Sequence, residues 1–432
     1  MRVLTVVTDF GIGGTQRVAQ NLTLGVKQAG VSVAVLAYNA SGPRERFFRD
    51  SGVPVFAPDE NDQSYPFIDE AIRWRPDIVH FHRSGYPNKR ETALIQAFKG
   101  QGARIVETNV FARYDGTEAR HLIDVHCLLS RWCWFKWSMW RASRDSSTAT
   151  ILPNAVDATN FKAIEAEERH AVRVSLGVPP GRFLFGRIGQ PMPTKWSPKI
   201  LSVFLRALAS GNDIGLVLVG APPEYAEEVA RLGQSVRDRI VMLAPIDDDV
   251  RLRSLYCAMD AFLHIAEIGE SFGMVLCEAL LCGTPVITLS TPLRDNSQLE
   301  VVGHEQGGLV ARDIEGVLEA MERIQRDEAL RERVREKGSS WIEGRFGVNV
   351  VSSKAVQIYN SVLASTNRAD LQRRLDALGD IPPDFSWLAE IQGKGLGSMP
   401  TLSQKALFRI LHVPQVYATY QIVKRGFAKA SR

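Results

Sequence analysis

The most informative stretch of the chain reads Glu270-Ser-Phe-Gly-Met-Val-Leu-Cys-Glu278-Ala-Leu-Leu-Cys-Gly283-Thr-Pro-Val-Ile287. It places Glu270 in a loop and Glu278 inside a short apolar helix, and a Gly/Pro stop precedes a new strand. A helix that begins near Phe272 or Gly273 leaves free backbone N–H groups beside Glu270, where an anion or a sugar hydroxyl can bind. Two carboxylates at this end can accept hydrogen bonds from hydroxyls. The segment therefore suits a phosphorylated sugar better than an apolar ligand.

Short β-rich runs alternate with helical segments on both sides of this stretch. In the first helical segment we expect Thr15 to cap a helix that runs to about Gln28. Strands that alternate with helices predict an α/β protein with parallel sheets covered on both faces. The runs that predict buried strands lie at residues 3–7, 31–37, 53–56, 76–82, 103–107, 183–189, 214–219, 240–243, 261–265 and 285–289.

The alternating pattern is interrupted once, by a charge-rich segment at residues 162–182. We therefore predict an N-terminal Rossmann-like domain at residues 1–168 and a C-terminal one at residues 169–347. An amphipathic helix is expected at residues 348–364, crossing back to the N-terminal domain. Residues 365–432 are expected to form a basic, partly helical extension.

Composition and charge narrow the class of protein. The 432 residues are 45% hydrophobic and 23% charged, which is ordinary for a globular protein of two or three domains. A net charge of +4 without a long basic run argues against nucleic acid as the main partner. The five cysteines form no CxxC pair, and no apolar run approaches the ~20 residues of a membrane-spanning helix. We expect a cytoplasmic protein that can associate peripherally with the inner face of the plasma membrane.

Two loops carry patterns typical of phosphate binding. Gly11-Ile-Gly13-Gly14-Thr15-Gln16 follows the first predicted strand, and its glycines let a ligand approach the backbone at a helix N-terminus. Gln16, and the lack of an acid at the end of the second strand, argue against a dinucleotide. Arg187 and Lys195 flank a Gly/Pro loop after a later strand, and two cations there suit a diphosphate. The alternatives are a tight structural turn for the first loop and solvated charges for the second.

Four further patterns have more than one interpretation. His82 ends a predicted strand, where ligands of parallel sheets lie, so it is either a substrate contact or a structural histidine. Asp247-Asp-Asp249 has the form of a metal-binding DxD motif, but it directly precedes a helix and is expected to cap it. The aromatic run Arg131–Trp140 predicts a helix in the core, at a membrane interface or beside an acceptor. The basic segment 391–432 is either a solvated surface or a patch that docks on anionic lipid.

Together these motifs resemble the retaining glycosyltransferases of family 4 (glycosyl transferases group 1), which have the GT-B fold of two Rossmann-like domains facing a central cleft. The resemblance spans about residues 1–364. Its most specific part is the pair Glu270 and Glu278, followed by Cys282-Gly-Thr-Pro-Val286. The supporting motifs are the Gly13-Gly14-Thr15 loop, Pro153-Asn-Ala-Val-Asp157 with Phe161, Gly186-Arg187 with Lys195, and Gly307-Gly-Leu-Val310. The chain departs from the family pattern at Asn109, Ala155 and Ile265-Ala266.

The resemblance implies a role for each charged residue of the predicted site. Arg187 and Lys195 would hold the diphosphate of a nucleotide-sugar and, with Glu270, would form the catalytic set. Glu270 would accept hydrogen bonds from the hydroxyls of the donor sugar, and Glu278 from the ribose.

The resemblance also implies a set of donor-binding and acceptor-side positions. The backbone that would meet the sugar and phosphate belongs to Ser271, Phe272, Gly273, Met274 and Val275. The loop that would close over the phosphate from the other domain is Gly13, Gly14 and Thr15, the base would rest near Pro245 and Ile246, and the acceptor side would contain His82 and Asn109.

We therefore expect a retaining, metal-independent glycosyltransferase without a cofactor, which moves a sugar from a nucleotide-diphosphate donor to a hydroxyl acceptor. The acceptor would be a saccharide or a lipid-linked sugar in cell-surface polysaccharide or glycolipid synthesis. Two alternatives stay open. A nucleotide-sugar epimerase of the same architecture would need no acceptor, and a non-catalytic nucleotide-sugar-binding protein would bind without turnover.

Overall fold

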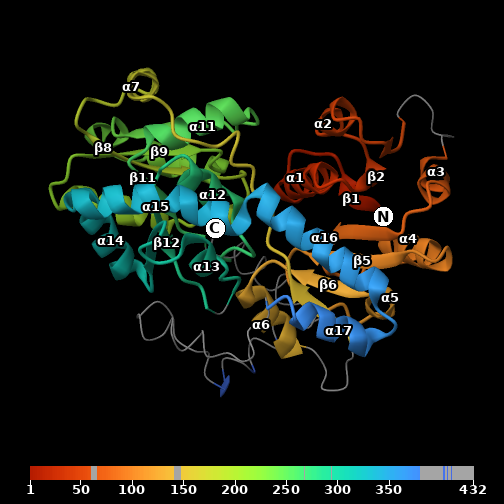
Figure 1. Cartoon of the computed structure of the whole chain (residues 1–432). Coiled ribbons are helices and arrows are strands. Elements are labelled where there is room, and N and C mark those ends of the chain that lie inside the picture. The colour runs from red at the N-terminus through yellow and green to blue at the C-terminus, as the bar shows by residue number, and fades with distance from the viewer. Residues whose placement is uncertain are drawn as a thin grey trace, which may run out of the picture.

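Two parallel β-sheets, each covered by helices, form the protein (Figure 1). The predicted α/β architecture with two Rossmann-like sheets is confirmed. The computed structural model describes residues 1–59, 66–140, 147–266, 268–292 and 294–379, with the isolated residues 402, 403, 406 and 410. The predicted lipid-docking segment, residues 391–432, lies outside the described residues except for those four.

The first sheet has seven described strands in the order β3-β2-β1-β4-β5-β6-β7. Their order reverses between β1 and β4, which is the point where open α/β sheets leave a crevice for ligands at the carboxyl ends of the strands. The strands are β1 Arg2–Asp9, β2 Ser32–Ala40, β3 Val55–Phe56, β4 Ile78–Arg83, β5 Arg104–Asn109, β6 Val125–Leu128 and β7 Ala149–Ile151.

The second sheet has six described strands in the order β10-β9-β8-β11-β12-β13. The corresponding reversal lies between β8 and β11, so the carboxyl ends of these two strands border a second crevice. The strands are β8 Phe183–Ile188, β9 Ile214–Val219, β10 Ile240–Leu243, β11 Ala261–His264, β12 Val286–Leu289 and β13 Gly308–Ala311.

Helices connect the strands in both halves. In the first half they are α1 Gly14–Gln28, α2 Glu45–Asp50, α3 Phe67–Arg73, α4 Lys89–Gly100, α5 Ala119–Leu122 and α6 Arg131–Trp140. In the second half they are α7 Ala166–Ser175, the 3₁₀ turn Pro193–Lys195, α8 Lys199–Ala209, α9 Pro223–Ala230, α10 Gln234–Arg237, α11 Asp249–Ala258, α12 Met274–Leu281, α13 Gln298–Val302, α14 Ile314–Arg326 and α15 Glu328–Phe346. Two more follow, α16 Val348–Ala364 and α17 Arg368–Asp376.

Most strand residues are buried because both faces of each sheet are covered by helices. In β1, Val3 and Val7 pack in one cluster with residues of α1 and α16, and Leu4 and Val6 pack in another with residues of α4. A third cluster covers the outer face of the six-stranded sheet.

The chain crosses between the halves twice, and the two crossings are hydrogen-bonded to each other. Val156 N donates to Phe346 O at 2.8 Å, and Val348 N donates to Val156 O at 3.2 Å. Beyond the second crossing α16 packs along α1 (Figure 1).

Two local expectations differ from the structure, and a third agrees with it. Thr15 does not cap α1: the N-cap is Gly13, without a side-chain hydrogen bond, and Thr15 lies inside the first turn. The boundary predicted between residues 168 and 169 falls within α7, whose Arg169 and Arg173 form ion pairs with Asp260 beside β11. The helix expected at residues 348–364 has the bounds of α16.

Candidate functional site

The loop that leads from β11 into α12 ends at Gly273, where the sequence predicted that a helix would begin. Gly273 is the N-cap of α12 and has φ +97°, a left-handed conformation that favours glycine. A Cβ there would also lie 2.7 Å from Leu276 Cδ1. No side chain caps α12, so none of the first N–H groups of the helix is bonded to a capping side chain.

Glu270 is buried, and its two carboxylate oxygens have different partners, an ammonium group and an imidazole ring. Lys195 Nζ lies 2.5 Å from Glu270 Oε2, and His264 Nε2 lies 3.3 Å from Oε1. Burial alone would raise the pKa of Glu270, but the Lys195 ammonium and the His264 hydrogen bond outweigh burial, and the pKa lies well below its usual range. Glu270 is therefore a carboxylate at neutral pH and can accept hydrogen bonds from a ligand.

His264 is a neutral group that orients this carboxylate. Burial, with the nearby charge of Arg187, lowers its pKa to about 4. His264 Nδ1 lies 3.0 Å from Thr288 Oγ1. A proton on Nε2 lets the ring donate to Glu270 while Nδ1 accepts from the Thr288 hydroxyl. The sequence analysis did not identify His264 as a partner of Glu270.

Arg187 is a buried cation, and two of its three guanidinium nitrogens have no hydrogen-bond partner among the described residues. Its Nη2 donates to Lys195 O at 3.0 Å, and its guanidinium lies over the rings of Trp196 and Phe262. Its Nε and Nη1 are buried and have no hydrogen-bond partner among the described residues. Burial lowers the pKa of Arg187, and Glu270 opposes this shift. Because an unpaired buried charge is costly, an anionic ligand such as a phosphate would stabilise this arrangement.

Glu278 lies one turn into α12 and is held from both halves of the protein. Tyr256 OH donates to Oε2 at 3.0 Å, and Arg17 Nη1 of α1 donates to Oε1 at 3.1 Å. Arg17 also pairs with Asp249 at the start of α11. Burial raises the pKa of Glu278, and Arg17 opposes this shift. No sequence pattern indicates the contact between Arg17 and Glu278, because the partners lie in different halves.

A cavity of about 210 Å³ opens beside this pair. Its charged lining residues are Arg17, Arg44, Asp157, Asp249 and Glu278, and Phe161 and Met274 line it as well. Burial, with the charge of Arg17, lowers the pKa of Arg44 to about 10. The cavity thus lies between α1 of the first half and α12 of the second.

The remaining predicted donor positions lie on loops at the carboxyl ends of strands. Gly13 and Gly14 form the start of α1, and Asp9 holds this loop by accepting from Gly11 N at 2.8 Å and from Gln16 Nε2 at 2.9 Å. Pro245 and Ile246 lie in the loop after β10. The donor loop itself continues into α12, whose first residues are Met274 and Val275.

The two acceptor-side predictions differ in how their side chains are used. Asn109 is buried, and its amide is occupied: Nδ2 donates to Arg113 O at 2.7 Å, and Oδ1 accepts from Arg113 N at 3.0 Å. His82 is buried beside the ring of His80, and neither of its ring nitrogens has a hydrogen-bond partner among the described residues. Burial lowers the pKa of His82 to about 4, so the ring is neutral at physiological pH.

The acidic run before α11 has the capping geometry that the sequence favoured. Asp248 is the N-cap of α11, and its side chain accepts from Arg251 N at 2.9 Å. In the part of the chain that the structure describes, no group of three or more His, Cys, Asp or Glu side chains is placed to hold a metal ion.

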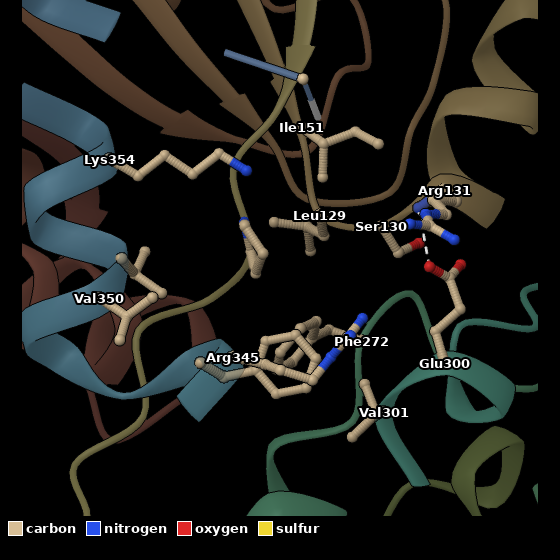
Figure 2. A pocket seen from close by; sticks show the side chains of 14 residues that line it. Leu129, Ser130, Arg131, Ile151, Phe272, Glu300, Val301, Arg345, Val350 and Lys354 are labelled. Carbon is tan, nitrogen blue, oxygen red and sulfur yellow. Dashed lines mark hydrogen bonds between the residues drawn. The ribbon is translucent and has the colours of Figure 1, made fainter. Parts of the chain in front are cut away.

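A second cavity, of about 270 Å³, lies between the halves near the chain crossings (Figure 2). Its charged lining residues are Arg131, Glu300, Arg345 and Lys354. Phe272 forms part of its wall, but neither Glu270 nor Lys195 does. The cavity therefore borders the back of the donor loop and is separate from the cluster around Glu270.

The two sheets define the class of fold. Two Rossmann-like parallel sheets with helices on both faces form the GT-B fold. The crystal structure of Anabaena HepE in complex with UDP-glucose superposes with a TM-score of 0.64 at 16% identity, over 84% of this chain and 100% of that one. This likeness concerns the fold. No described helix is both long enough and apolar enough to cross a membrane.

Sequence comparisons agree with this class. Residues 183–327 match the model of the family described as "Glycosyl transferases group 1". The chain is 28% identical to the D-inositol 3-phosphate glycosyltransferase of Nocardia farcinica, over 54% of this chain and 52% of the relative. It is also 28% identical to the phosphatidyl-myo-inositol mannosyltransferase of Mycobacterium leprae, over 54% and 59%. The chain thus spans about half the length of the curated relatives it matches.

Proposed function

We propose that the protein is a retaining, metal-independent glycosyltransferase that moves a sugar from a nucleotide-diphosphate donor to a hydroxyl acceptor. The observation that carries the proposal is the charge cluster at the start of α12. There the buried Arg187 has unpartnered N–H groups, and the Lys195 ammonium lies 2.5 Å from the Glu270 carboxylate. The match of residues 183–327 to group 1 glycosyl transferases supports it, because Arg187, Lys195, Glu270 and Glu278 all lie within that range.

In this proposal the cations act on the leaving group. Negative charge builds on the diphosphate as the glycosidic bond breaks, and fixed donors aimed at that charge lower the barrier. Arg187, Lys195 and the N–H groups at the start of α12 are the donors that we assign to this role. Since these groups are already in place, a metal ion is not required in the proposal.

Glu270 and Glu278 would recognise hydroxyl groups of the donor. Glu270 would share its carboxylate between Lys195 and the sugar, and Glu278 would receive the ribose beside Tyr256. The base would lie near Pro245 and Ile246. The loop Gly13-Gly14-Thr15 would cover the phosphates from the other half, which would exclude water from the donor.

The acceptor is assigned to the crevice at the carboxyl ends of β1 and β4. His82 lies near the end of β4, and its neutral ring could accept a hydrogen bond from an acceptor hydroxyl. Asn109 would act indirectly, by fixing the loop to Arg113. One relative is named a D-inositol 3-phosphate glycosyltransferase and another a phosphatidyl-myo-inositol mannosyltransferase, which supports a saccharide or lipid-linked acceptor in glycolipid or polysaccharide synthesis. Peripheral membrane association through residues 391–432 remains part of the proposal.

A donor panel tests the proposal. The protein would be mixed with uridine and guanosine diphosphate sugars, first alone in a thermal-shift assay and then with lipid-linked saccharide acceptors. The proposal expects one donor to raise the melting temperature and to give a glycosylated product with retained anomeric configuration. An isomerised nucleotide-sugar without acceptor would indicate an epimerase, and binding without any product would indicate a non-catalytic protein.

A further inference from the structure

Helix α6 belongs to the seven-stranded half in sequence, yet it packs against the loop that carries Glu270. Trp132, Cys133 and Trp137 are buried. Cys133 and Trp137 share one apolar cluster with Phe272 and Leu276 of the donor loop and α12. The aromatic character of α6 is therefore explained by burial between the halves, in line with the core interpretation of its sequence.

Three polar side chains at the start of α6 or on it reach the other half. Ser130 Oγ lies 2.7 Å from Ser297 Oγ, and the Cys133 thiol donates to Ser271 O at 3.2 Å. The Lys136 ammonium pairs with Asp295. The Lys136 side chain is only 1% exposed, so this ion pair is desolvated and geometrically constrained.

Contacts from the other half also reach back to α6. The Glu300 carboxylate accepts from the backbone N–H groups of Arg131 and Trp132, at 3.1 and 2.7 Å, and so caps the helix (Figure 2). The Trp132 indole donates to Arg294 O at 3.2 Å. The segment from Arg294 to Glu300 is thus held by α6 at both of its ends.

The same segment fixes the backbone of Glu270. Glu270 N donates to Gln298 Oε1, and Ser297 N donates to Glu270 O, both at 3.0 Å. Asp295 N donates to Ile268 O at 3.1 Å. A Cβ on Gly269, which has φ +67°, would lie 1.6 Å from Asp295 O, so the two segments are in direct backbone contact. Contacts therefore run without interruption from α6, through residues 294–300, to Glu270.

We infer that Ser130, Cys133 and Lys136 are positioning residues for Glu270, so that the acceptor-side half sets the geometry of the donor-sugar carboxylate. The inference rests on the proposed function only in giving Glu270 a role toward the donor sugar. Loss of these contacts would leave the nucleotide contacts at Arg187 and Lys195 in place and would loosen the loop at Glu270. Transfer would then be impaired more than donor binding.

Hydrogen exchange of the full chain without ligand tests the positioning. The variants are Lys136→Met and Ser130→Ala, and the control is Lys99→Met, which breaks the Lys99–Asp124 pair inside the seven-stranded half. We expect amides of residues 268–274 to exchange about tenfold faster in both variants, and at the wild-type rate in the control. Rates within twofold of wild type in all three would overturn the inference. Where Lys136→Met does not fold, Asp295→Asn replaces it.

Kinetics then separate this inference from the proposed function. We expect Ser130→Ala and Lys136→Met to lower kcat for transfer about tenfold while the donor KM stays within threefold of wild type. An equal loss through donor KM would contradict a positioning role. If the wild-type chain transfers no sugar from any donor, the proposed function fails, whereas the exchange rates still decide whether α6 fixes the loop.

Discussion

The Arg17 guanidinium of α1 lies 3.1 Å from the Glu278 carboxylate of α12, although the two residues are 261 positions apart in sequence. Arg17 also pairs with Asp249, so one arginine of the first half contacts two acids of the second. On α6, Lys136 forms another ion pair between the halves, with Asp295. Ion pairs between the halves therefore lie near both predicted glutamates.

The Arg17 contact predicts a stability effect. Arg17→Met keeps the aliphatic part of the side chain but leaves Glu278 without its cation. We expect the free energy of unfolding to fall by about 2 kcal/mol, less than for a fully buried pair because Asp249 is partly exposed. Urea denaturation measures this change. Arg231→Met, which breaks the exposed pair with Glu227, should cost less than about 0.5 kcal/mol. Equal effects of the two substitutions would contradict the assignment.

Glu270→Gln tests the proposed catalytic role. The substitution keeps the shape of the side chain but removes the charge that Lys195 and the donor sugar would share. We expect turnover to fall about 100-fold, equivalent to about 2.7 kcal/mol in the barrier, with a smaller effect on folding. Steady-state transfer rates check this, and Glu305→Gln, at a surface pair with Arg323, serves as the control. Wild-type rates in Glu270→Gln would show that this carboxylate takes no part in the reaction.

Lys195→Ala tests the diphosphate contact. Without the ammonium, the diphosphate would lose one of its two proposed cations, so we expect the affinity for a nucleoside diphosphate to fall about tenfold, or about 1.4 kcal/mol. Calorimetric titration measures it. Lys199→Ala, an exposed lysine at the first position of α8, should leave the affinity unchanged. The role of Lys195 is refuted if both variants bind like wild type.

The neutral state of His264 predicts a pH dependence of stability. Its pKa is about 4 in the folded protein and near its usual value of about 6.5 when unfolded, so the unfolded chain binds the proton first as the pH falls. The contribution of His264 is thus complete above pH ~6.5 and is lost as the pH falls toward 4, by up to about 3 kcal/mol. Urea denaturation between pH 7 and 4.5 should show a shallower decline for His264→Asn than for wild type. Parallel curves would contradict the shift.

The fold elements that carry the site could be predicted from the sequence. Alternating β-rich runs and helices predicted both parallel sheets, and the expected helix start near Phe272 or Gly273 agrees with α12, whose N-cap is Gly273. The assignment of Lys195 and Glu270 to one site came from the resemblance to family 4 glycosyltransferases, and the structure places Lys195 Nζ 2.5 Å from Glu270 Oε2.

Contacts that depend on how distant side chains meet could not be predicted. Nothing near Arg17 or Lys136 in sequence indicates Glu278 or Asp295 as the partner. His264 is close to Glu270 in sequence, but no pattern indicates that their side chains meet. Asn109 also has a local role that the sequence did not indicate, because its side-chain amide forms hydrogen bonds with the backbone of Arg113. Helix α17 lies in the extension that was predicted to be partly helical, but its bounds were not predicted because most of its residues are charged. Asn367 caps it by accepting from Asp370 N.

A crystal structure of the chain with a bound uridine or guanosine diphosphate hexose tests the central claim most directly. We predict that the diphosphate contacts the unpartnered nitrogens of Arg187 and the Lys195 ammonium, that the hexose hydroxyls contact Glu270, and that the ribose contacts Glu278. A nucleotide-sugar found elsewhere on the protein, with the groups around Glu270 arranged as they are without ligand, would contradict the account.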